Sequence, residues 1–196
     1  MSQDDYFVME SANNDDYPLF AWDQTSPGII KGVPAVVNAP LSARLGDPIS
    51  PHYKLVDYHV MPEPVISQLI KAVLDAAHIE GIQLLPIALR LPKEKSPMLD
   101  KYWLLHVVNK IACLDKTKSE VEYSKSGETI FGIEKLALDE TVLKNIPIHK
   151  RLIFVLSENV SVYLIHKTIK EKILEKKPVG LRFFKVTEWN SDLVFE

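Results

Sequence analysis

The sequence predicts an α+β protein whose sheet is mainly antiparallel and built from hairpins. Short apolar, β-branched runs separated by turn residues recur along the chain, and only two stretches repeat apolar residues at helical spacing. Hairpin connections imply antiparallel pairing, and a helix lying on a sheet buries its apolar side. We therefore expect two amphipathic helices, near residues 63–78 and 165–177, packed on the sheet.

The first third of the chain differs in composition from the rest. Residues 23–51 are rich in proline and glycine, which favours a segment that wraps the surface, with 33–37 as an edge strand. Aromatic residues interrupt the acidic ones before it, whereas disordered tails are poor in aromatics. We therefore divide the chain into residues 1–54, an acidic, proline-rich segment docked on the main domain, and residues 55–196, the α+β domain itself.

The first helix follows a proline-rich turn and precedes Gly81, as helix ends often do. Its apolar face comprises Val65, Ile66, Leu69, Ile70, Val73, Leu74 and Ala77. Residues 82–91 then read as a strand in which Pro86 forces an edge position or a bulge.

The second half of the chain predicts mostly strands. Residues 102–108 form an apolar strand, and two hairpins follow, at 120–124 with 129–138 and at 151–156 with 160–164. Pro178 and Gly180 end the second helix, and 181–186 supply a last strand.

Composition narrows the class of protein. The chain has 196 residues, a net charge of -3 and one cysteine, so a disulfide framework is excluded and a reducing compartment is indicated. It lacks an apolar run of the roughly 18 residues that a membrane span needs, and its first residues lack the features of a secretory signal. We expect a cytoplasmic protein with no membrane partner.

The charge is unevenly distributed. The first 30 residues hold six acidic residues and no lysine or arginine, a pattern typical of a segment that binds a basic partner. The best candidate for a basic surface, residues 167–182, is diluted by Glu171 and Glu175, which argues against a nucleic-acid surface. The candidate partner-binding residues are Asp4, Asp5, Glu10, Asp15, Asp16, Tyr17, Trp22 and Asp23.

Residue patterns for catalysis, cofactors and metals are missing. The histidines are scattered without HxxxH or CxxC spacing, and the seven glycines form neither a phosphate-binding loop nor GxSxG. Cys113 and His106 are the residue types of a thiolate pair, but on one continuous strand they would face opposite sides. We therefore predict that the protein is not an enzyme and that it has neither a cofactor nor a metal site. The remaining alternative is a hydrolase whose active site the sequence does not reveal.

A set of segments occurs in a familiar order: PVIS at 64–67, GIQLLPI at 81–87, YWLLHVVN at 102–109, LD at 114–115, KSE at 118–120, IEKLALD at 133–139, IF at 153–154 and GLRF at 180–183. Over about residues 55–187 the chain resembles family 11 of the immunity proteins of bacterial polymorphic toxin systems. His166 stands where that family more often has a short polar residue, so the last helix could start differently.

The resemblance implies a cytoplasmic protein that binds and neutralises a cognate toxin encoded by a neighbouring gene. It brings no catalytic residues. The leading alternative is a regulatory or scaffolding module that binds another protein.

Overall fold

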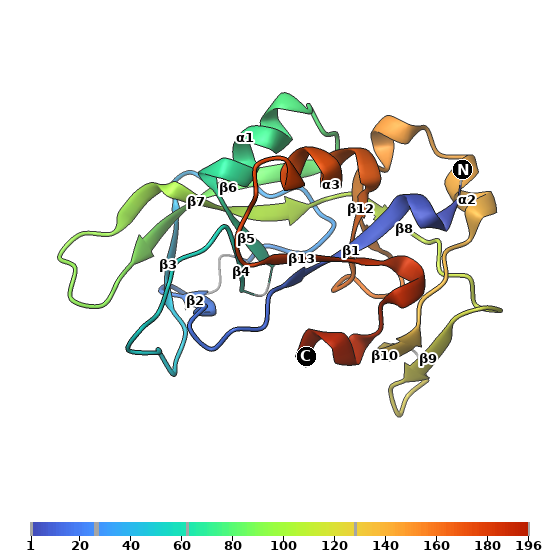
Figure 1. Cartoon of the computed structure of the whole chain (residues 1–196), viewed down its shortest axis with the longest axis horizontal. Helices are drawn as coiled ribbons and strands as arrows, with labels where there is room; N and C mark the ends of the chain where they lie inside the picture. Colours follow the sequence, from blue (N-terminus) through green and yellow to red (C-terminus); the bar gives the residue numbers. More distant parts are fainter. Residues whose placement is uncertain (1, 26–27, 62, 128, 196) are drawn as a thin grey trace.

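The strands of the computed structural model, which describes residues 2–25, 28–61, 63–127 and 129–195, form two sheets and a separate hairpin (Figure 1). The six-stranded sheet has the order β2 (Phe20–Trp22), β3 (Leu41–Leu45), β6 (Ile82–Arg90), β7 (Met98–Val107), β5 (Pro64–Ser67), β4 (Tyr58–Val60). The five-stranded sheet has the order β13 (Leu181–Lys185), β1 (Tyr6–Ser11), β12 (Tyr163–His166), β11 (Ile153–Leu156), β8 (Lys110–Ile111). The hairpin pairs β9 (Glu120–Tyr123) with β10 (Ile130–Lys135).

Helices accompany these sheets, and most strand pairs are antiparallel. The α-helices are α1 (Gln68–Ala76), α2 (Glu140–Lys144) and α3 (Lys167–Leu174), and the short 3₁₀ helices are η1 (Gln3–Asp5), η2 (Ile148–Lys150), η3 (Val186–Glu188) and η4 (Ser191–Phe195). In the two larger sheets, β3 runs parallel to β6 and β8 runs parallel to β11, while the other pairs are antiparallel. The predicted α+β class is confirmed.

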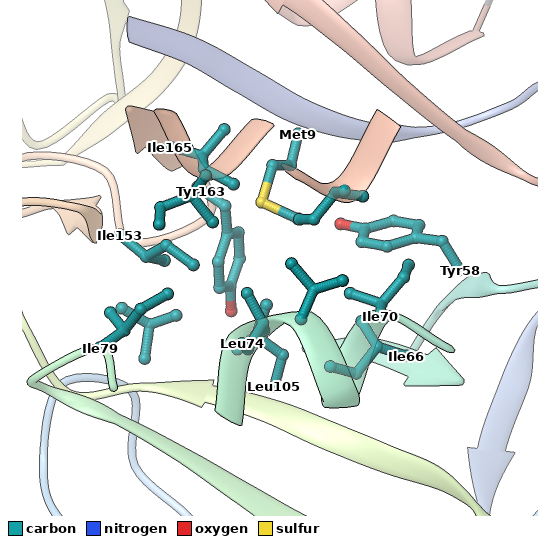
Figure 2. Close-up of a cluster of buried hydrophobic side chains, with 14 of the residues drawn as sticks. Met9, Tyr58, Ile66, Ile70, Leu74, Ile79, Leu105, Ile153, Tyr163 and Ile165 are labelled. Atoms are coloured by element: carbon teal, nitrogen blue, oxygen red, sulfur yellow. The ribbon is translucent and has the colours of Figure 1, made fainter. Parts of the chain in front are cut away.

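The main core lies where the two sheets and the two longer helices meet. Helices α1 and α3 contact each other, and both place apolar side chains in this core. Figure 2 shows Ile70 and Leu74 of α1 facing Ile153 of β11, Tyr163 and Ile165 of β12. Burial of such side chains stabilises a fold by roughly 1.5–3 kcal/mol each, so this shared core holds the two sheets together.

The opposite face of each sheet has a core of its own. Successive residues of a strand point to opposite faces, and Phe154 and Leu164 therefore pack away from the main core, beneath α2 and the β9–β10 hairpin. On the six-stranded sheet, Val65 and Leu104 pack against β2, β3 and the proline-rich segment. Both sheets are therefore covered on two sides.

Both helices start directly after a strand, at a side chain that caps them. Ser67 Oγ accepts a hydrogen bond from Leu69 N–H, and His166 Nδ1 accepts one from Thr168 N–H. Residues 64–67 and 165–166, expected to be helical, belong to strands β5 and β12. The helices are therefore shorter than the predicted 63–78 and 165–177, and they end at Ala76 and Leu174. His166 provides the hydrogen-bond acceptor that a short polar N-cap residue normally supplies. Helix α3 is therefore capped in the usual way despite the histidine.

The N-terminal 54 residues contribute strands that the sequence did not predict. β1 lies between β12 and β13 in the five-stranded sheet, and β3 pairs with both β2 and β6. Residues 33–37 do not form the expected edge strand. Pro86 lies in an interior strand, but β3 pairs with β6 only from Ile87 onward, so the missing N–H falls where β6 has one neighbour. The division at residue 54 stays a prediction.

Candidate interaction surface

The acidic residues at the start of the chain lie at one end of the molecule, near α3. Asp4 is exposed, and its carboxylate accepts a hydrogen bond from Ser2 Oγ. Asp5 is partly buried and pairs with Lys167 Nζ at 2.7 Å, and this hydrogen bond lowers the pKa of the Asp5 carboxyl. Asp5 therefore joins η1 to α3 and is already engaged within the chain.

Glu10 lies in β1 and is half-buried. Its carboxylate accepts a hydrogen bond of 2.9 Å from the indole Nε1 of Trp189, and burial raises the pKa of Glu10. The side chain of Trp189 is itself buried. The pair ties the C-terminal segment to the five-stranded sheet rather than facing a partner.

The next acidic residues belong to the segment between β1 and β2. Asp15 is exposed. Asp16 accepts a hydrogen bond from Ser50 Oγ at 2.8 Å and lies 3.7 Å from Lys54 Nζ. Tyr17 is half-buried beside it in sequence. Asp16 thus holds the proline-rich segment in place, whereas Asp15 is accessible.

Trp22 and Asp23 lie at the edge strand β2, on the opposite side of the molecule from η1 (Figure 1). Trp22 is half-buried against the core beneath the six-stranded sheet. Asp23 accepts two hydrogen bonds from the guanidinium of Arg90, at 2.5 and 2.6 Å, and these bonds lower the pKa of Asp23.

The eight candidate residues therefore do not form one patch. They are distributed over both ends of the molecule, and four of the carboxylates, those of Asp5, Glu10, Asp16 and Asp23, hold segments of the chain together. The remaining two, Asp4 and Asp15, are the exposed ones. Acidic composition alone could not separate these two groups, because the difference depends on tertiary partners.

A thiolate pair does not form from Cys113 and His106. Cys113 is buried in the core beneath α2, and burial raises the pKa of its thiol to about 12. His106 instead contacts Glu63 and the backbone of Val33. A thiol with so high a pKa is not a nucleophile at neutral pH. Within the described part of the chain, His, Cys, Asp and Glu side chains form no group suited to a metal ion.

Glu63 and His106 form a buried ion pair across neighbouring strand ends. They are 5% and 0% exposed, and His106 Nδ1 lies 2.7 Å from Glu63 Oε2. His106 Nε2 donates to the carbonyl of Val33, also at 2.7 Å. Burial works against the charged imidazole, but the hydrogen bonds to Glu63 and Val33 prevail and raise the pKa of His106. The pair therefore holds the segment around Val33 against the six-stranded sheet.

His59 also holds two segments of the chain together, but as a neutral imidazole. Its Nδ1–H donates to the carbonyl of Pro18 at 2.8 Å, its Nε2 accepts from Val56 N–H at 3.0 Å, and its ring stacks on Phe20. Burial lowers the pKa of His59 to about 4. The ring thus joins β4 to the start of β2.

The lowered pKa of His59 predicts a loss of stability in acid. The contribution of neutral His59 is complete above pH 6.5 and disappears as the pH falls toward 4, because only the unfolded chain binds a proton readily in that range. A shift of this size corresponds to about 3 kcal/mol. Urea unfolding between pH 7 and 4 should show this dependence weakened in His59→Asn but kept in His52→Gln, whose histidine is exposed. Identical pH dependence in His59→Asn and the wild type would contradict it.

Exposed aromatic side chains gather on the β9–β10 hairpin. Phe131 is 81% exposed and Tyr123 is 52% exposed. Sequence reasoning found the hairpin but missed these two residues, since a strand's alternation predicts which residues share a face and not which face is covered. The available signal was Phe131 between Ile130 and Gly132, next to a glycine that interrupts the pattern.

Comparison with known proteins identifies the family. No curated protein matches the chain. A family model described as "Immunity protein family (Imm11)" matches residues 32–188, so the similarity begins earlier than the residue 55 expected from the ordered segments. Among the described residues, no helix is both long and apolar enough to cross a bilayer. The match spans most of the chain, and the protein therefore belongs to the Imm11 immunity protein family.

Proposed function

We propose that this protein neutralises a cognate toxin of a bacterial polymorphic toxin system by binding it, without catalysing a reaction. Membership of the Imm11 family is the observation that carries the proposal. The protein would act in the cytoplasm of the cell that it protects, on a protein encoded by a neighbouring gene. Its net charge of -3 favours a protein partner over nucleic acid or a membrane surface.

Co-expression tests this function directly. Cells that produce the C-terminal toxin domain encoded by the neighbouring gene should stop growing, and production of this protein in the same cells should restore growth. The two proteins should also co-purify. Failure of the intact, folded protein to restore growth would contradict the proposal.

The acidic N-terminal residues remain proposed contacts of the toxin, with Asp4 and Asp15 as the accessible members. Exposed carboxylates accelerate association with a basic protein through long-range attraction. The double variant Asp4→Lys/Asp15→Lys should associate about three- to tenfold more slowly at low salt. The exposed Glu94 of the β6–β7 loop offers the matched control, Glu94→Lys. Equal association rates for the double variant and the control would remove these residues from the interface.

A further inference from the structure

The β9–β10 hairpin stands apart from the two larger sheets. Among the described strands, β9 and β10 pair only with each other, and Figure 1 shows them at the lower right, beside the C-terminal segment. One face of the hairpin is packed: Ile130 and Ile133 are buried in the core beneath α2, with Val121 against them. Because the packed face fixes the hairpin to the core beneath α2, the other face is exposed to solvent in a fixed position.

An irregularity in the pairing turns Phe131 outward. The register passes from Ile130 opposite Tyr123 to Gly132 opposite Glu122, which leaves Phe131 unpaired in a β-bulge. The bulge lets Ile130 and Ile133, three residues apart, both reach the core, while Phe131 is 81% exposed. Bulges commonly re-aim a side chain at functional sites. An exposed phenyl ring on a rigid strand is also an efficient interface contact, because it buries large area at little entropic cost.

Two carboxylates, unpaired among the described residues, belong to the same hairpin as this ring. A Cβ atom at Gly132 would lie 3.1 Å from Glu122 Oε2, so the Glu122 carboxylate lies over the glycine next to Phe131. Glu134, three residues beyond Phe131, is exposed. Within the described part of the chain neither Glu122 nor Glu134 pairs with a cation, whereas Glu120 has Lys135 at 3.7 Å. The face therefore offers an apolar centre with acidic groups available beside it.

We propose that the outer face of this hairpin, formed by Phe131, Glu122 and Glu134, docks on a positively charged surface of the toxin. Phe131 fills the centre of the contact, and the carboxylates pair with lysine or arginine side chains around it. An arginine of the partner also stacks favourably on an aromatic ring. The inference rests on the proposed function and adds to it the surface and the charge of the partner.

The test uses full-length protein and an inactivated C-terminal domain of the toxin encoded by the neighbouring gene. The dissociation constant of their complex is measured by isothermal titration calorimetry at low and at moderate salt concentration. Phe131→Ser should bind at least tenfold more weakly at both salt concentrations. Glu122→Lys/Glu134→Lys should also bind at least tenfold more weakly at low salt and should lose most of the salt dependence.

Matched variants control for general surface effects. Val36→Ser removes an apolar side chain that is 90% exposed elsewhere, and Glu94→Lys reverses an exposed charge of the β6–β7 loop. Both should bind within twofold of the wild type. Thermal unfolding of Phe131→Ser should match the wild type, because the ring contributes little buried area in the free protein.

The outcomes separate this inference from the function on which it rests. A wild-type protein that binds the toxin while both hairpin variants bind equally well overturns the inference and leaves the proposed function standing. If the hairpin variants change only the self-association of the protein, the inference is also overturned, because the face would then bind a second copy of this chain. No binding by the wild type overturns the proposed function itself.

Discussion

Deleting residues 1–11 is expected to abolish cooperative unfolding of the protein. The deletion removes β1, which lies between β12 and β13, and with it the buried side chains of Tyr6, Phe7, Val8 and Met9. Four such side chains contribute roughly 6–12 kcal/mol in total, which is comparable with the entire stability of a typical domain. Urea unfolding monitored by tryptophan fluorescence should show no sigmoidal transition.

A shorter deletion provides the control. Removing residues 1–4 leaves β1 and the Asp5–Lys167 ion pair intact and removes mainly the two hydrogen bonds that Gln3 makes to the region of α2. It should lower the free energy of unfolding by about 1–2 kcal/mol while keeping a single transition. A cooperative transition in the chain without residues 1–11 would contradict the structural role of β1. Because of that role, the acidic residues are best tested by substitution.

Replacing Glu63 with alanine is expected to lower the free energy of unfolding by about 3–5 kcal/mol. The substitution removes the carboxylate that stabilises the charged imidazole, and it leaves the fully buried His106 without a hydrogen-bond partner at Nδ1. Glu63→Gln should cost much less, because the amide can donate to Nδ1 of a neutral ring that still donates from Nε2 to Val33. Urea unfolding of both variants at pH 6 measures the difference. Equal losses for alanine and glutamine would show that the charge pair is not what the site requires.

The same pair has a pH dependence opposite to that of His59. The pKa of His106 is raised in the folded protein, so the pair's contribution is complete below about pH 6.5 and is lost as the pH rises through the raised value. The stability difference between the wild type and Glu63→Gln should therefore shrink from pH 6 to pH 9. A constant difference over this range would contradict the assignment of the proton to His106.

Local pattern was enough to predict the elements whose signal lies within one stretch of sequence. The second hairpin, the strand after Gly81 and both longer helices are present, because apolar periodicity and turn residues act within a few positions. The start of α1 was misplaced for a physical reason: residues 64–67 pair with β4 and β7, and that pairing overrides a helical pattern which continues through them.

Features that depend on distant partners could not be predicted. β1 belongs to the stretch of acidic and aromatic residues that suggested a docked arm, yet its neighbours β12 and β13 lie more than 150 residues away in sequence. Asp16 and Asp23 looked like members of a binding surface, but Ser50 and Arg90 meet them only in the fold. Gly132 next to Phe131 marks an interruption of the strand pattern, but the exposure of Phe131 depends on which face of the hairpin the second core covers.

Titrating a fixed amount of the toxin domain with purified protein tests the central proposal most directly. If neutralisation occurs by binding, residual toxin activity should fall linearly and reach its minimum at one equivalent of protein, with no further change over time. Inactivation of the toxin by a small fraction of an equivalent, progressing as the mixture is incubated, would show that the protein acts by catalysis instead.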